Sequence, residues 1–143
     1  MPAISLVIAD WDTVRTDARA IRWAVFVDEQ HVPVELEWDD FDAVSWHAVA
    51  YDGAGAPVAT GRLLPDGHIG RMAVVKSSRG LGIGGTLLEG LMAKAIELGY
   101  PELILNAQTA ALSFYARYGF KAEGDEFMEA GIAHRAMRKS MTA

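Results

Sequence analysis

The sequence predicts an α/β fold of three layers, in which helices cover both faces of a central mixed sheet. Two observations predict it. Short apolar runs that are typical of strands alternate along the chain with longer segments of helical periodicity. A glycine-rich turn at 80–85 joins one apolar run directly to a helical pattern, as α/β units do. With 143 residues, 51% of them hydrophobic, the chain has the size and composition of one domain, so we expect a single domain over residues 1–143.

The first half of the chain is expected to form one helix and four strands. Apolar residues alternate over 4–9, whereas Val14, Ala18, Ile21 and Val25 share one face of a helix. Turn residues separate the later apolar runs. In order, we expect a strand at 4–9, a helix from an Asp12 or Thr13 cap to about Asp28, hairpin strands at 46–52 and 57–64, and a strand from the turn Asp66-Gly67 to Val75.

The second half begins with the helical pattern that follows the glycine turn. This helix is expected to end at Gly99, with Pro101 behind it, because glycine and then proline commonly close helices. The remaining expected elements are a strand at 103–107, a helix from about Thr109 to Tyr118, and two short strands near Lys121–Glu123 and His134–Lys139.

Composition excludes several classes of protein. The absence of cysteine excludes disulfides, thiolate metal sites and cysteine nucleophiles. The four histidines show no metal-ligand spacing, so we expect no metal. There is no apolar run of 18 residues and no signal-peptide pattern, so we expect a cytoplasmic protein without a membrane segment. The net charge of −6 and the pI near 5.1 argue against nucleic acid as a partner.

The net negative charge of the chain lies in one segment. Residues 28–42 hold seven acids and no Lys or Arg, whereas the rest of the chain is almost balanced. Pro33 and the lack of periodicity predict an irregular loop rather than a helix or strand. The segment is either a solvated acidic loop or a rim that attracts a cationic amine substrate.

Residues 69–86 are the most informative stretch of the chain. A strand, the turn and a helix N-terminus together form an anion cradle, because several backbone N–H groups and the helix dipole point at one place. This predicts a phosphorylated cofactor. Gly80-x-Gly82-x-x-Gly85 fits the dinucleotide fingerprint, but that fingerprint belongs on the first strand of a Rossmann unit with an acid closing the next strand. Here the turn lies mid-chain and the next strand ends in Asn106, so the Rossmann interpretation is rejected.

Two motifs carry a resemblance to a known family. Arg79-x-x-Gly82-x-Gly84 resembles the loop that holds the coenzyme A pyrophosphate in the GCN5-related N-acetyltransferase (GNAT) superfamily. The segment 106–120, with its Asn, Ala, Phe-Tyr and Gly-Phe, resembles that family's following helix. The ends of the chain, at 24–30, 61–62 and 129–134, are similar to the ElaA-like subfamily. The resemblance implies a GNAT-like α/β/α fold with a mixed, mostly antiparallel sheet that splays at the cofactor site.

The resemblance also implies an acetyl-CoA site. The backbone around Met72, Ala73 and Val74 would pair with the pantetheine arm like an added strand. Lys76 has a plausible phosphate role by its charge, and Asn106 either bonds the cofactor arm or caps the following helix. The residues expected to hold the pyrophosphate are those of the loop and first helical turn: Arg79, Gly80, Leu81, Gly82, Ile83, Gly84, Gly85 and Thr86.

For catalysis, Tyr115 matches the family's leaving-group tyrosine, and its phenol can donate a proton to the departing thiolate. Tyr118, one turn on, is expected to be a packing residue. The general base stays open between His134 and Glu29, with Glu129 and His47 as further candidates. Arg22 is expected to be a cation on the helix surface, although a substrate contact is an alternative.

The resulting hypothesis is an acetyl-CoA-dependent N-acetyltransferase that acts on a small-molecule or peptide amine, and family members are often homodimers. Two alternatives are a non-catalytic acetyl-CoA-binding regulator and an acyl-homoserine-lactone synthase, whose first helix has an Arg-x-x-x-Phe element like that of Arg22 and Phe26. The identity of the acceptor does not follow from the sequence.

Overall fold

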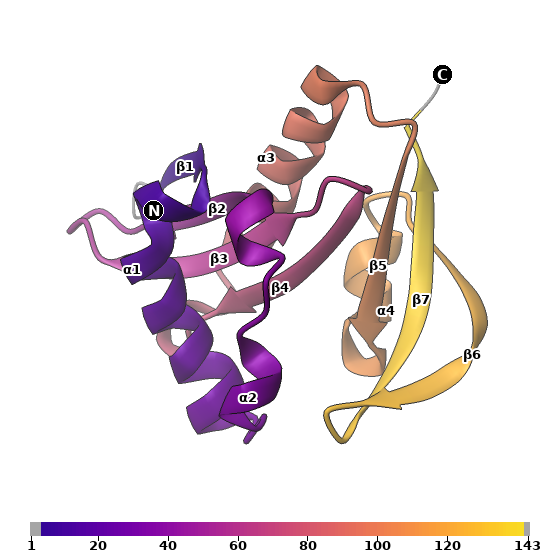
Figure 1. Cartoon of the computed structure of the whole chain (residues 1–143), viewed down its shortest axis with the longest axis horizontal. Helices are drawn as coiled ribbons and strands as arrows, with labels where there is room; N and C mark the ends of the chain where they lie inside the picture. Colours follow the sequence, from indigo (N-terminus) through magenta and orange to yellow (C-terminus); the bar gives the residue numbers. More distant parts are fainter. Residues whose placement is uncertain (1–3, 142–143) are drawn as a thin grey trace.

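A seven-stranded sheet runs through residues 4–141, the part of the chain that this computed structural model describes (Figure 1). Its strand order is β1-β2-β3-β4-β5-β7-β6, and only the β4–β5 neighbours run parallel. The strands are β1 (Ser5–Ala9), β2 (Trp46–Tyr51), β3 (Pro57–Leu63), β4 (His68–Val74), β5 (Glu102–Gln108), β6 (Lys121–Glu129) and β7 (Ile132–Ser140). The prediction of a mixed, mostly antiparallel sheet is confirmed.

Helices lie on both faces of this sheet, which confirms the three layers (Figure 1). In β2, Val49 packs against α1, whereas Ala48 and Ala50 pack against α3, as the period of two requires. The helices are α1 (Trp11–Arg22), which continues as the π-helix η1 (Trp23–Glu29), α2 (Val34–Glu37), α3 (Ile83–Leu98) and α4 (Leu112–Ala116), with 3-10 turns η2 (Asp42–Val44), η3 (Lys76–Ser78) and η4 (Thr109–Ala111). None of the helices in residues 4–141 has the length and apolar character needed to cross a membrane.

The sheet splays between β4 and β5, as expected. The two strands pair through His68 with Ile104 and through Ile69 with Leu105. Beyond Ile69 the strands separate, and Figure 1 shows β1–β4 on one side of the gap and β5–β7 with α4 on the other. The backbone of β4 from 70 to 74 therefore has a partner on its β3 side but none on its β5 side.

Four local expectations are corrected. Asp10 rather than Asp12 or Thr13 caps α1, because its carboxylate accepts hydrogen bonds from the backbone N–H and the hydroxyl of Thr13. The helix continues past Arg22 with π geometry. The acidic segment, which was expected to be an irregular loop, contains the one-turn helix α2. The two C-terminal strands β6 and β7 are longer than predicted, because they pair with each other as a hairpin and β7 also pairs with β5.

A β-bulge changes the direction of β4 next to the point where β4 and β5 separate. Between the pairs Thr60–Ala73 and Arg62–Gly70, β4 has one residue more than β3. Arg71 takes the strain of this bulge with a φ of 51°, in the left-handed region. The Met72 sulfur then packs directly against Gly61, where an added Cβ would lie 2.4 Å from it. Gly61 is therefore required for this close approach.

This packing leads to a stability prediction. Gly61→Ala is expected to lower the free energy of unfolding by about 1–3 kcal/mol, because the new methyl group overlaps the Met72 sulfur and lies 3.1 Å from Leu91. Gly70→Ala in the adjacent strand is the control, since no atom lies within 4 Å of its added Cβ. Denaturant unfolding followed by circular dichroism measures both; equal losses in the two variants would contradict the overlap.

Candidate active site

Two cavities meet where the sheet splays. The larger, of about 560 Å³, lies between the segment 26–41, β4 and the strands β5 and β7. The smaller, of about 280 Å³, follows β4 towards the start of α3. Gln30, Met72 and Tyr115 line both cavities. A molecule in the smaller cavity and another in the larger one would therefore contact each other beside Tyr115.

The glycine loop has the geometry of an anion cradle. Gly80 and Gly82 have φ values of 79° and 78°, which only glycine adopts without strain, and Gly82 caps α3. The first backbone N–H groups of a helix have no intrahelical partner, so those of Ile83, Gly84 and Gly85 are available to an anion. Gly85 serves a second purpose, because the Tyr118 hydroxyl packs against it and an added Cβ would lie 2.1 Å away. This contact agrees with the expected packing role of Tyr118.

The residues expected to hold the cofactor fall into three groups. Those from β4 and the loop that line the smaller cavity are Met72, Ala73, Val74, Arg79 and Gly84. The remaining loop residues lie at or near the start of α3, outside both cavities. Asn106 is exposed and lines the larger cavity, and Gln108 rather than Asn106 caps the turn that follows β5. The capping alternative for Asn106 is therefore wrong.

Glu29 is held by Arg79 at the end of the π-helix. The carboxylate accepts two hydrogen bonds, of 2.6 and 2.7 Å, from the Arg79 guanidinium, whose Nε donates to the Val74 carbonyl oxygen at 2.9 Å. The Arg79 hydrogen bond holds the pKa of Glu29 below its usual range. Glu29 lines neither cavity. The structure thus separates it from Tyr115 and His134, which share the larger cavity.

Tyr115 is buried, with 9% of its surface exposed, and its ring contacts Phe114 and Phe120 edge-on. Burial raises the pKa of Tyr115 to about 12, because the charged phenolate is poorly solvated there. The phenol is therefore protonated across the neutral range. Its place at the junction of the two cavities is what its expected role requires.

His134 lies on β7 opposite Gln108 and is almost fully buried. Its Nδ1 is 2.7 Å from the Ile132 carbonyl oxygen. A carbonyl only accepts, so Nδ1 carries a proton and Nε2 of the neutral ring has a free lone pair. The Glu129 carboxylate lies 3.5 Å from Nε2, close enough to stabilise a protonated ring. Both residues line the larger cavity, whereas His47 is buried elsewhere and donates from Nε2 to the Asp42 carbonyl oxygen.

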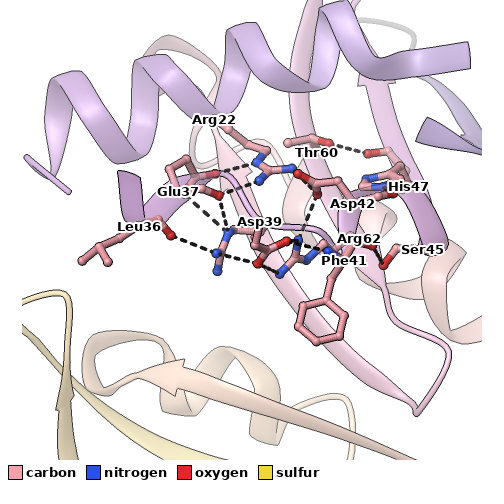
Figure 2. A network of polar contacts seen from close by, with 12 residues as sticks. Arg22, Leu36, Glu37, Asp39, Phe41, Asp42, Ser45, His47, Thr60 and Arg62 are labelled. Carbon is pink, nitrogen blue, oxygen red and sulfur yellow. Dashed lines mark hydrogen bonds and ion pairs between the residues drawn. The ribbon is translucent and has the colours of Figure 1, made fainter. Parts of the chain in front are cut away.

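Figure 2 shows a buried ionic cluster that sequence reasoning missed. Arg22 is 1% exposed, and its side chain donates to the carboxylates of Glu37 at 2.5 Å and Asp42 at 2.8 Å. Arg62 binds the same Asp42 oxygen at 2.9 Å and Asp39 at 2.7 Å. The expectation of an Arg22 on the helix surface is wrong, because the acids of the 28–42 segment fold back over it.

The cluster also corrects both interpretations of the acidic segment. Four of its seven acids pair with arginines, so it is neither simply solvated nor an open anionic rim: Glu29, Glu37, Asp39 and Asp42. Burial raises the pKa of Glu37 despite Arg22, whereas the Arg62 hydrogen bond lowers the pKa of Asp39. The excess of acids in this segment was visible in the sequence, but the arginines that pair with four of them were not.

One further pair of residues and one single residue at the cavities had no sequence signal. Gln108 donates from its amide to the Gln30 oxygen at 3.0 Å, which joins the two halves of the splayed sheet across its opening. Arg71, at the bulge, lies beside the ionic cluster and lines the larger cavity. Within residues 4–141, no three acidic or histidine side chains form a group that could hold a metal ion.

Comparison with known proteins agrees with this geometry. Residues 14–141 match the acetyltransferase (GNAT) domain family. The uncharacterized N-acetyltransferase YjcF of Bacillus subtilis is 42% identical over 137 residues, covering 93% of this chain and 97% of YjcF. An acyl-CoA N-acyltransferase from Pseudomonas aeruginosa superposes with a TM-score of 0.86 at 29% identity, over 96% of this chain and 100% of its own. Escherichia coli ElaA superposes with a TM-score of 0.85 at 24% identity and the same coverage, so it shows a common fold.

The ionic cluster predicts a large cost for removing Arg22. Arg22→Met leaves Glu37 and Asp42 buried without their partner, which is expected to cost about 3–5 kcal/mol in the free energy of unfolding. Arg15→Met is the matched control, because Arg15 is exposed on the same helix and should change stability by less than about 0.5 kcal/mol. Urea unfolding followed by tryptophan fluorescence measures both, and a loss for Arg22→Met as small as that of the control would refute the buried charges.

Proposed function

This chain belongs to the GNAT acetyltransferase family, and from that premise we propose that it transfers the acetyl group of acetyl-CoA to a primary amine by direct attack on the thioester. The observation that carries the proposal is the meeting of the two cavities at Gln30, Met72 and Tyr115. One cavity continues towards the glycine loop and the other opens beside His134. This arrangement brings two substrates together at one phenol.

Acetyl-CoA fits the smaller cavity and the loop beyond it. Apart from the Val74 carbonyl oxygen, which already accepts from Arg79, the free edge of β4 at 70–74 offers backbone N–H and C=O groups to the amides of the pantetheine arm. The amides of the loop and first helical turn, those of Ile83, Gly84 and Gly85 among them, and the dipole of α3 would hold the pyrophosphate. The amides of Arg79 and Thr86 already donate to the carbonyl oxygens of Lys76 and Gly82. Since Glu29 already neutralises Arg79, the backbone rather than this side chain supplies most of the attraction. Acetyl-CoA supplies an activated acyl group, whose carbon–sulfur bond breaks as the bond to the amine nitrogen forms.

Tyr115 serves as the general acid. Its raised pKa keeps the proton in place until sulfur departs, and the phenol then donates that proton to the leaving thiolate. The same burial acts on a thiolate that forms beside the phenol and makes it more basic, which favours the transfer. A phenol in this position also gives the sulfur a hydrogen-bond donor while negative charge develops on it.

His134 serves as the general base. Its Nε2 lone pair takes the proton that the attacking amine loses, and the Glu129 carboxylate stabilises the resulting imidazolium. Glu29 is less suited to this role, because the bidentate bond from Arg79 lowers its basicity. We assign Glu29 instead to the positioning of Arg79 against the Val74 carbonyl oxygen at the cofactor groove.

The first experiment tests cofactor binding. Calorimetry is expected to show micromolar acetyl-CoA binding by the wild-type chain and none of NAD. Gly82→Glu should abolish acetyl-CoA binding, because it places an anion in the cradle. The control is Gly99→Glu at the other end of α3, where the backbone has the same φ of 78° and an added Cβ is equally free. Weak binding by both variants would indicate damage to the helix, and unimpaired binding by Gly82→Glu would remove the loop from the site.

The role of Tyr115 as the general acid is tested by a separate experiment. Tyr115→Phe keeps the ring and removes the proton, so kcat for acetyl transfer should fall by about 100-fold while the Kd of acetyl-CoA stays within about twofold. Thiol release from acetyl-CoA in the presence of a primary amine measures kcat. Tyr118→Phe, one helical turn further on, should keep its kcat. An unchanged kcat in Tyr115→Phe would exclude the phenol from the mechanism.

A further inference from the structure

The charges that line the larger cavity are almost all paired. Asp39 accepts from Arg62 at 2.7 and 2.9 Å, and Glu37 accepts from Arg22 at 2.5 Å. Glu129 lies beside His134. Glu37 and Asp39 therefore have arginine partners already, whereas the half-exposed Glu129 carboxylate only lies near the Nε2 of His134, at 3.5 Å.

Arg71 is the most exposed of the three arginines at this wall of the cavity. Its side chain is 26% exposed, whereas those of Arg22 and Arg62 are 1% and 6% exposed. Its contacts, with Glu37, Asp39 and the carbonyl of Leu36, are all 3.3–3.5 Å long, whereas Arg22 and Arg62 make contacts of 2.5–3.0 Å.

Among the described residues, two arginine N–H groups in this part of the cavity have no hydrogen-bond partner. Within residues 4–141, the Nη1 group of Arg71 has no protein partner. Arg62 is 5% exposed and lines the same cavity, yet its Nε also lacks a hydrogen-bond partner in the described chain. The carboxylates that approach Arg71 are each bound more tightly by another arginine. Since the Nε of Arg62 is itself fully buried, the donor left for a ligand is the Nη1 group of Arg71.

The backbone places Arg71 next to the transfer point. It lies at the bulge of β4, where its left-handed φ of 51° is a strained conformation for an arginine. Met72, the following residue, lines both cavities. A group held by Arg71 is thus one residue along the strand from the place where the two substrates meet.

We propose that the acceptor is an amino acid whose carboxylate binds Arg71, an inference that rests on the proposed acetyl transfer and adds its substrate class. A planar guanidinium with free N–H donors recognises a carboxylate through two parallel hydrogen bonds. A bound carboxylate replaces the long contacts of Arg71 with short ones. Apolar residues of the same cavity fit an apolar side chain of the acceptor: Phe26, Val32, Leu64 and Ile132.

The test compares two acceptors that differ only in this group, L-phenylalanine and L-phenylalaninamide, by their kcat/KM for acetyl transfer. The wild-type chain should prefer the acid by about tenfold or more, because a site built for a charged hydrogen-bonded group rejects an analogue that lacks it. Arg71→Gln should reduce this preference by about tenfold, and Arg71→Lys should restore part of it through its charge. Arg138→Gln is the control, since Arg138 pairs with Glu102 and Glu123 outside both cavities, and it should keep the wild-type ratio.

The ratio separates recognition from a purely structural role of Arg71. A variant that only loosened the segment 36–39 would lose rate with both acceptors and keep the ratio. Transfer to both acceptors at similar kcat/KM by the wild-type chain would overturn the carboxylate inference while leaving the acetyltransferase proposal intact. Transfer to no amine, despite acetyl-CoA binding, would instead count against the acetyltransferase proposal.

A binding measurement decides the inference independently of turnover. Calorimetry in the presence of coenzyme A compares N-acetyl-L-phenylalanine with N-acetyl-L-phenylalaninamide. The wild-type chain should bind the acid about tenfold more tightly, and Arg71→Gln should bind the two alike. Equal affinities in the wild-type chain, or no binding of the acid, would overturn the assignment.

Discussion

The separation of β4 from β5 is the constraint on which the rest of the site depends. Two residue pairs join these parallel strands before they diverge, so the free edge of β4 and both cavities follow from one break in the sheet. An unpaired strand edge at the centre of a sheet is costly unless another group bonds its backbone. The bulge at Arg71 and the close packing of Met72 on Gly61 fix the direction of this edge. The fold thus keeps open a strand position that a linear, amide-containing ligand can complete.

The ionic cluster fixes the other wall of the larger cavity. Two arginines and three acids bring together α1, the segment 37–42 and the strand β3, which lie far apart in sequence (Figure 2), and Arg71 of β4 lies beside them. Buried ion pairs contribute little net stability, because desolvation offsets their attraction, but breaking one leaves a buried charge and is costly. The cluster therefore acts mainly by holding an otherwise irregular segment in one place. Its acids bind Arg22 and Arg62 at 2.5–2.9 Å, whereas Arg71 makes only the longer contacts of 3.3–3.5 Å with Glu37 and Asp39.

Local patterns were predictable from sequence, whereas partners distant in sequence were not. The loop from Arg79 to Gly84, the end of α3 at Gly99 and the helical turn with Tyr115 were all predicted, since each depends on neighbouring residues. The burial of Arg22 was not, because its partners Glu37 and Asp42 lie 15 and 20 residues away in a segment without periodicity. Glu29 could not be assigned for the same reason: its partner Arg79 is 50 residues distant. The sequence supplied the charges but not the pairing.

The chemistry is divided between the two halves of the splayed sheet. The groups proposed to hold the substrates, the β4 edge, the loop and Arg71, lie in the half formed by β1–β4, whereas Tyr115 and His134 lie in the half that contains β5–β7. Catalysis needs these groups within hydrogen-bonding reach of one reaction centre, so the distance between the halves must be kept. The short β4–β5 pairing and the Gln108–Gln30 hydrogen bond join the halves at opposite ends of the opening. A ligand that bonds the free edge of β4 and also contacts Tyr115 would add a third connection between the halves.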